Sequence, residues 1–174
     1  KKKFSSKLIV PNLKNYKKIK HRIKNNYLTS KINDENMYFT YSLARLLKIK
    51  ENSFISAIQT FKGLSHRFEI FLKKKNITFI DDSKATSFAA SQLALSSLKN
   101  IYWILGGLPK KDDRFNLSKY KKNIVKCYII GKNLGFFRNQ IKDKLPFSIT
   151  KNFSNSLIQI IKDINYQKQA NPTL

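Results

Sequence analysis

Three short polar stretches of this chain carry residue types that could bind and activate anionic groups. Residues 61–69 read Phe-Lys-Gly-Leu-Ser-His-Arg-Phe-Glu, residues 79–87 read Phe-Ile-Asp-Asp-Ser-Lys-Ala-Thr-Ser, and a double glycine stands at residues 106–107. An arginine presents a planar fork that suits phosphate, and a histidine can exchange a proton near neutral pH. Together with the lysine and hydroxyl side chains beside them, these residues indicate a site that handles phosphate or carboxylate groups.

Each stretch also has a simpler interpretation. Asp82 could cap a helix, whereas Lys84 and Thr86 could bind an anion together with backbone N–H groups at the start of that helix. His66 and Arg67 could be a surface pair in a linker, although linkers between domains are common places for ligand contacts. The double glycine could permit close approach of a substrate or could form a plain turn. The order and spacing of the stretches therefore carry more weight than any one of them.

Short apolar runs alternate with helical patterns from residue 64 onward. We expect strands at 68–72, 78–80, 101–105, 126–130 and 147–149, and helices at 87–98, 117–123, 136–142 and 154–164. Strands that begin near 78, 101, 126 and 147 recur about every 25 residues, which is typical of βαβ units and a parallel sheet. The loops after these strands should share one edge of the sheet, where ligands usually bind.

The region before residue 64 has a different pattern. Apolar residues at three- and four-residue steps predict a helix over residues 37–47, and Ser53 is the expected N-cap of a second helix that ends before Gly63. Residues 1–29 are rich in lysine and give no firm assignment. We therefore expect two parts, residues 1–63 and residues 64–174, and the sequence suggests a chain that is cut at both ends.

The composition limits the classes of protein. With 174 residues, 41% of them hydrophobic, the chain can bury a core, and its net charge of +25 comes mainly from lysines spread over every segment. This spread favours a lysine-biased composition over a nucleic-acid footprint, because base recognition prefers arginine. The single Cys127 excludes an internal disulfide. No apolar run is long enough for a membrane span and no signal peptide is evident, so we expect a cytoplasmic protein.

The three stretches, in this order and at these separations, resemble the Mur ligases, and within them the members that add D-glutamate. The resemblance covers roughly residues 28–174. It implies an ATP-dependent amide ligase that joins D-glutamate to UDP-N-acetylmuramoyl-L-alanine in peptidoglycan synthesis, through an acyl phosphate. It also implies an α/β fold: a partial α+β remnant of a central ATPase domain in residues 1–63, then most of a Rossmann-like C-terminal domain with a mainly parallel sheet flanked by helices.

The resemblance assigns roles by position. It implies that ATP is contacted by Asn33, Asn36, Arg67 and Asp82, that His66 and Lys84 lie at the reacting groups, and that Thr86 and Lys110 bind the carboxylates of D-glutamate. Mg²⁺ would accompany ATP. The carbamylated lysine and the metal-binding histidine of the family are missing here, so the resemblance implies that the Mg²⁺ ligands lie outside this chain. We expect no metal ligands within the chain, in which no Cys and His set has metal-ligand spacing. We also expect a monomer.

The chain departs from the family at several points. Ser65 replaces a proline, Asp81 stands where asparagine is common, and Leu108 replaces a residue that is sometimes acidic. The phosphate loop of the family is missing, so we expect the chain alone to catalyse no ligation. Two alternatives stay open: another ATP-dependent ligase of the Mur or folylpolyglutamate-synthase type, and a basic nucleic-acid-binding α/β module.

Overall fold

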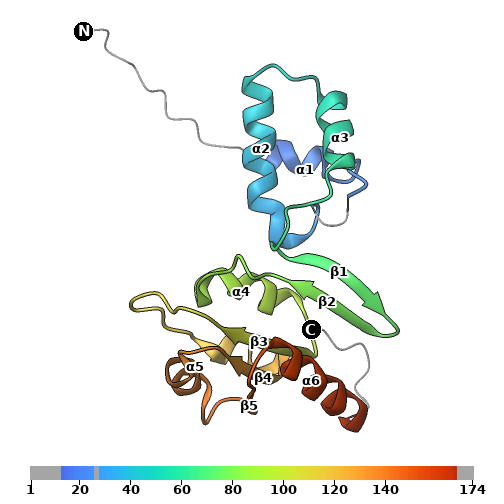
Figure 1. Cartoon of the computed structure of the whole chain (residues 1–174). Helices are drawn as coiled ribbons and strands as arrows, with labels where there is room; N and C mark the ends of the chain where they lie inside the picture. The colour runs from blue at the N-terminus through green and yellow to red at the C-terminus, as the bar shows by residue number, and fades with distance from the viewer. Residues whose placement is uncertain (1–12, 26–27, 168–174) are drawn as a thin grey trace, which may run out of the picture. The chain divides into compact units, whose positions relative to one another are not determined.

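A computed structural model describes residues 13–25 and 28–167 of the chain. The chain divides into two compact units, Lys1–Gly63 and Leu64–Leu174. Figure 1 shows the helices and strands of both units, and each unit is described by itself. None of the helices within the described ranges is long and apolar enough to cross a membrane.

The first unit is helical. It contains α1 (Leu13–Lys20), a 3-10 turn η1 (Lys31–Asn33), α2 (Asp34–Leu46) and α3 (Glu51–Thr60). The expected helix over 37–47 is therefore present and begins three residues earlier. One apolar cluster holds the helices together, with Tyr16 and Ile19 from α1, Met37 and Tyr41 from α2, and Phe54 and Ile55 from α3.

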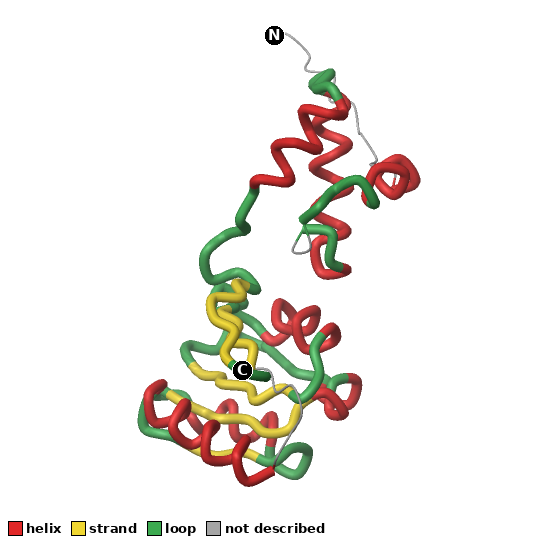
Figure 2. The backbone as a smooth tube through the Cα atoms, turned by 90° about the vertical axis from the view of Figure 1, so that its right-hand side faces the viewer, coloured by secondary structure: helices red, strands yellow, loops and turns green. Residues whose placement is uncertain are grey.

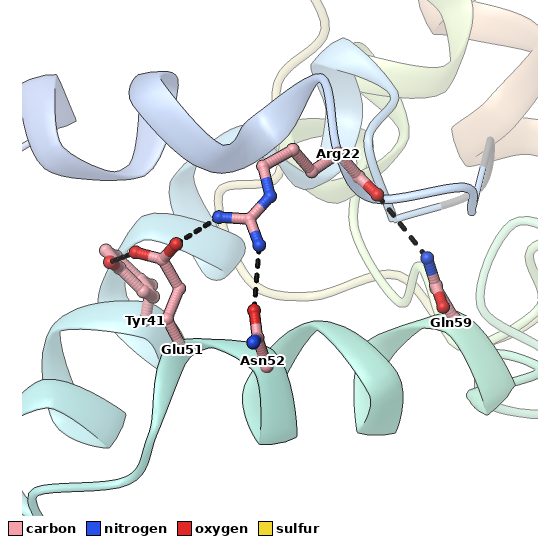
Figure 3. A network of polar contacts seen from close by, with 5 residues as sticks. All are labelled: Arg22, Tyr41, Glu51, Asn52 and Gln59. Atoms are coloured by element: carbon pink, nitrogen blue, oxygen red, sulfur yellow. Dashed lines mark hydrogen bonds and ion pairs between the residues drawn. The ribbon is translucent and has the colours of Figure 1, made fainter.

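A polar network joins the three helices at the start of α3 (Figure 3). The Arg22 guanidinium pairs with the Glu51 carboxylate and donates to Asn52 Oδ1 at 2.8 Å. The Tyr41 hydroxyl donates to Glu51 Oε2 at 3.0 Å. The prediction that Ser53 caps this helix is wrong: Lys50 is the N-cap, and the helix already begins at Glu51. A carboxylate in the first turn is favourable at the positive end of the helix dipole, and here it also has two partners.

The second unit is built on a parallel sheet of β3 (Ile101–Gly106), β4 (Ile124–Ile130) and β5 (Phe147–Ile149), in the order β3-β4-β5. The helices are α4 (Phe88–Ser97), α5 (Leu134–Ile141) and α6 (Phe153–Gln167), and Figure 2 distinguishes them from the strands. Side chains alternate between the two faces of a strand, so each face needs its own cover. The predicted α/β class with a parallel sheet flanked by helices is confirmed.

Two apolar clusters show which helix covers which face. On one face, Leu95 of α4 and Ile141 of α5 belong to the same cluster as the sheet residues Leu105, Cys127 and Ile129. On the other face, the α6 residues Ile160 and Ile164 pack with Tyr102 and Tyr128. The sheet is therefore buried from both sides, as parallel sheets usually are.

The first expected strand of the parallel sheet pairs differently. Residues of β1 (Glu69–Lys74) and β2 (Ile77–Asp81) form a separate two-stranded antiparallel sheet, with Glu69 opposite Asp81 and Lys74 opposite Ile77. The prediction that residues 78–80 begin the parallel sheet is therefore wrong. Only two residues connect β1 to β2, and the first of them, Lys75, has a φ of 53°. A two-residue connection is long enough for a hairpin but not for the crossover that parallel pairing requires.

The segment before β4 also differs from the prediction. A helix was expected over residues 117–123, but the chain forms two short 3-10 turns, η2 (Leu117–Lys119) and η3 (Lys121–Asn123). Asn123 ends this segment, and its side chain donates to the Leu95 carbonyl of α4 at 2.8 Å. Leu117 is buried in the core. These two contacts anchor both ends of the segment.

Candidate functional site

The His-Arg pair lies in a turn with an unusual backbone conformation. His66 has a φ of 64° and Phe68 has a φ of 48°, so both neighbours of Arg67 adopt the left-handed region. Residues with a Cβ atom rarely adopt this region, and surrounding contacts must compensate for the strain. Such strain often accompanies a functional position.

Hydrogen bonds from three directions hold this turn. The His66 N–H donates to Glu69 Oε2 at 2.8 Å, and the Lys84 N–H donates to the His66 carbonyl at 3.0 Å. The Phe68 N–H donates to Asp82 Oδ1 at 2.9 Å. The turn is therefore tied to the loop that follows β2, and two motifs far apart in the sequence form a single site.

The imidazole of His66 adds a side-chain contact to the same loop. Its Nδ1 lies 2.7 Å from Asp81 Oδ2, and the other carboxylate oxygen accepts the Ser83 N–H at 2.9 Å. Partial burial acts to raise the pKa of Asp81. The hydrogen bonds from His66 and Ser83 outweigh this effect, so the pKa of Asp81 is held below its ordinary value. The carboxylate therefore stays ionised at neutral pH.

The neighbouring carboxyl group is in a different environment. Burial raises the pKa of Asp82, and the charge of Asp81 adds to this effect. The Phe68 N–H and the positive charge of Arg67 act in the opposite direction without cancelling the rise. Two adjacent carboxyl groups are thus shifted in opposite directions, which is a property that functional sites often share.

The loop with Thr86 is connected to the loop with Lys110. The Phe88 N–H, at the start of α4, donates to both oxygens of the Asp113 carboxylate at 3.1 and 3.0 Å. The Asp113 N–H donates in turn to the Lys110 carbonyl at 3.2 Å. Thr86 lies two residues before Phe88, and the side chains of Thr86 and Lys110 are both exposed. The two loops therefore meet around Asp113.

These contacts also change the expected anion site at the start of α4. Ser87 is the N-cap, and its hydroxyl oxygen accepts the Ala90 N–H at 3.2 Å. Asp113 already accepts the Phe88 N–H. Two N–H groups of the first turn, together with the positive end of the dipole, thus have an internal carboxylate and a hydroxyl as partners. An anion bound here would rely on the side chains of Lys84, Thr86 and Lys110.

The double glycine has a packing explanation. A Cβ atom at Gly106 would lie 2.3 Å from the Ile130 carbonyl oxygen on β4, and Gly107 has a φ of 110°. The Gly107 carbonyl accepts a hydrogen bond from the Asn133 side chain at 2.8 Å. Close approach of β3 to β4 explains the first glycine, and the turn conformation explains the second.

The two asparagines predicted to contact ATP lie in the other unit. Asn33 is buried at the N-cap position of α2, where its side chain makes no capping hydrogen bond. Asn36 is exposed in the first turn of the same helix. The structure thus brings together six of the eight predicted site residues in the second unit, in two connected groups: His66, Arg67, Asp82 and Lys84 in one, Thr86 and Lys110 in the other.

Two residues that organise the site were not singled out from the sequence. Glu69 is the fourth residue of the His-Arg-Phe-Glu stretch, and it accepts the His66 N–H. Asp113 gives no local signal, because its partner Phe88 lies 25 positions away. Its place within the His-Arg-Phe-Glu stretch could have identified Glu69, whereas only the tertiary structure identifies Asp113.

No family model matches the chain. Curated proteins do: a UDP-N-acetylmuramoylalanine--D-glutamate ligase of Wolbachia pipientis wMel is 37% identical over 115 residues, which are 66% of this chain and 23% of that protein. Proteins of the same name from Rickettsia conorii and Rhizobium meliloti are 30% and 33% identical, over 75% and 70% of this chain and 26% of each relative. The chain thus spans about a quarter of the length of these relatives.

A solved structure of a murein peptide ligase from Psychrobacter arcticus 273-4 also aligns, over 80% of this chain and 32% of that one. Its sequence identity is 11% and the TM-score is 0.42. This likeness is too distant to bear on the function.

Proposed function

We propose that this chain, whose resemblance to the Mur ligase family is confirmed, supplies part of an ATP-dependent ligase that adds D-glutamate to UDP-N-acetylmuramoyl-L-alanine. The three relatives described above are named UDP-N-acetylmuramoylalanine--D-glutamate ligase, and the chain spans about a quarter of their length. We assign residues 1–63 to the end of a central ATP-binding domain and residues 64–174 to most of a C-terminal Rossmann-like domain. We place the reaction in the cytoplasm.

One observation carries the proposal. The strained turn around Arg67 is hydrogen-bonded to the loop that contains Asp82 and Lys84. A guanidinium and an ammonium group are thereby carried on two backbone segments that hydrogen bonds join. This arrangement suits a reaction in which negative charge accumulates on phosphate, because cationic groups stabilise that charge.

The proposed reaction has two steps. An acceptor carboxylate oxygen attacks the γ-phosphorus of ATP, ADP leaves, and an acyl phosphate forms. The D-glutamate nitrogen then attacks the acyl carbon, loses a proton, and expels phosphate as the amide bond forms. ATP is consumed in the reaction, and a bound Mg²⁺ would offset the negative charge on its phosphates. We expect the protein ligands of this Mg²⁺ outside this chain.

The residues of this chain divide these tasks. We assign Arg67 and Asp82 to the ATP side, and Lys84 and His66 to the reacting groups. Asp82 fixes the turn through the Phe68 N–H, so it also acts on the position of Arg67. In the first unit, Asn33 and Asn36 are assigned to the adenine side of ATP, where amide groups can read a base edge.

Thr86 and Lys110 are assigned to the carboxylates of D-glutamate. Both side chains are exposed, on loops that Asp113 connects. A lysine and a hydroxyl group donate the charge-assisted hydrogen bonds that a carboxylate accepts. The connection through Asp113 joins the backbones of the two loops that carry these donors.

The test uses a full-length ligase in which this chain replaces the matched segment of one of its relatives. Lys110→Ala and Thr86→Ala should each raise the KM for D-glutamate at least about tenfold, with little change in the KM for ATP. The neighbouring Lys111→Ala is the matched control and should leave both values unchanged. Equal effects of Lys110→Ala on the two substrates would contradict the carboxylate assignment.

A further inference from the structure

Two carboxylates face each other directly across the β1–β2 hairpin. Glu69 and Asp81 are cross-strand partners in the antiparallel register, and both side chains are partly exposed. Like charges in directly opposite positions destabilise a strand pair. A positive charge between the two carboxylates would remove this cost.

His66 completes a set of three potential ligands. One ligand atom from each of His66, Glu69 and Asp81 lies within 4.8 Å of the others. The shortest separation is 2.7 Å, between His66 Nδ1 and Asp81 Oδ2. Zn²⁺ bonds nitrogen and oxygen ligands at about 2.0–2.2 Å in a tetrahedral arrangement, in which two ligand atoms lie about 3.3–3.6 Å apart, so these two atoms must separate by somewhat less than about one ångström to admit an ion.

The three ligands are already oriented by the backbone. Glu69 Oε2 accepts the His66 N–H at 2.8 Å, and Asp81 Oδ1 accepts the Ser83 N–H at 2.9 Å. Each carboxylate therefore has one oxygen fixed and can offer the other. The Lys84 N–H holds the His66 carbonyl at 3.0 Å and so fixes the residue that carries the imidazole. Such outer contacts usually orient metal ligands.

We propose that His66, Glu69 and Asp81 bind one divalent transition-metal ion of the Zn²⁺ class, through Nδ1 and one oxygen of each carboxylate. An imidazole nitrogen with two carboxylates suits such an ion, whereas Mg²⁺ prefers oxygen ligands alone. The ion takes the place of the proton between His66 and Asp81. It links β1, β2 and the turn, so it would rigidify the position of Arg67. This site is separate from the Mg²⁺ that would accompany ATP.

The test is titration of the whole chain, purified free of metal, with Zn²⁺ in a calorimeter. We expect one ion per chain. Asp81→Asn, which keeps the size of the side chain, should weaken the affinity by about 10- to 100-fold, and Glu69→Gln should do the same. His21→Ala and Asp112→Asn remove an exposed histidine and an exposed acid elsewhere and serve as controls. They should bind Zn²⁺ like the unchanged chain.

Thermal unfolding provides the second measurement. Zn²⁺ should raise the Tm of the unchanged chain more than that of Asp81→Asn at the same concentration, because an ion that binds only the folded state stabilises it in proportion to its affinity. Mg²⁺ at the same concentration should give no shift. The proposal is overturned if no Zn²⁺ binds at millimolar concentration, or if Asp81→Asn binds as tightly as the unchanged chain. Neither result depends on ligase activity, so the outcome is independent of the proposed function.

Discussion

The two sheets of the second unit differ in what holds them together. In the β3-β4-β5 sheet, Cys127, Tyr128 and Ile129 are 0% exposed. In the β1–β2 hairpin, Ile70 and Phe71 are 47% and 56% exposed. The parallel sheet is stabilised by apolar burial. The hairpin is less buried, with Ile77 packed against the α6 cluster, and it adds charged and polar contacts at the end where Glu69 and Asp81 face each other.

The β3-β4-β5 sheet is the scaffold of the second unit, and most of the candidate site lies at the β1–β2 hairpin. The strained turn and the two carboxyl groups with shifted pKa values all lie at the hairpin, and the buried sheet carries the loops that position Lys110. Strain of this kind needs a rigid support. The less buried element carries the strained and charged groups, and the buried element supplies the support.

The largest effect should come from the buried sheet. Ile129→Ala should lower the free energy of unfolding by about 2–5 kcal/mol, because it removes fully buried methyl groups and leaves a cavity. Ile70→Ala is the matched control in the hairpin and should cost about 1 kcal/mol, since half of the side chain is already in water. Urea unfolding followed by fluorescence of Trp103, the single tryptophan, measures both. Equal costs would contradict the division between scaffold and site.

A smaller effect should follow from Asp82. Asp82→Ala leaves the partly buried Phe68 N–H without its acceptor, which should cost about 1–3 kcal/mol. Asp82→Asn keeps an acceptor and removes a charge that burial disfavours, so it should cost less. Hydrogen exchange of the Phe68 amide, measured beside urea unfolding, reports the loss directly. If the two variants are equally unstable, the hydrogen bond is not what holds the turn.

The smallest effect concerns pH. The pKa of Asp81 is below its ordinary value in the folded chain, so its contribution to stability is fully present above the unfolded pKa of about 4. The contribution is lost as the pH falls through the lower, folded pKa. The stability difference between the unchanged chain and Asp81→Asn should therefore be constant from pH 7 to about 5 and shrink below about 4.

The control for this prediction adds His66→Gln to both chains, the unchanged chain and Asp81→Asn. Removing the imidazole removes its hydrogen bond to Asp81, so the acid-dependent part of the difference should decrease. An unchanged pH dependence would show that the shift of Asp81 does not come from His66.

The parallel sheet could be predicted from the sequence, and the hairpin could not. The strand predicted at 147–149 coincides with β5, because a short apolar run between turns has few alternatives. The same reasoning gave a strand near residue 78, but apolar alternation does not distinguish parallel from antiparallel pairing. The two residues that connect β1 to β2 are Lys75 and Asn76, so the sharp turn had only an asparagine and no glycine to indicate it.

Prediction of the candidate site from the sequence has the same limit. The motifs assign His66, Asp82 and Lys84 to one site, and the hydrogen bonds between their segments agree with that assignment. The left-handed conformation of His66 was not predictable, because it is imposed by partners from another segment. Glu69 and Asp81 become neighbours only through the register of the hairpin, so the metal-ligand spacing is not visible in the sequence.

The most direct test of the proposed function is amide-bond formation by the full-length ligase that contains this chain in place of the matched segment. We predict a product that depends on ATP, UDP-N-acetylmuramoyl-L-alanine and D-glutamate together, with L-glutamate giving none, and no product from the isolated chain. A ligase of this kind that folds and binds ATP but gives no product with D-glutamate, or gives it equally with L-glutamate, would contradict the account.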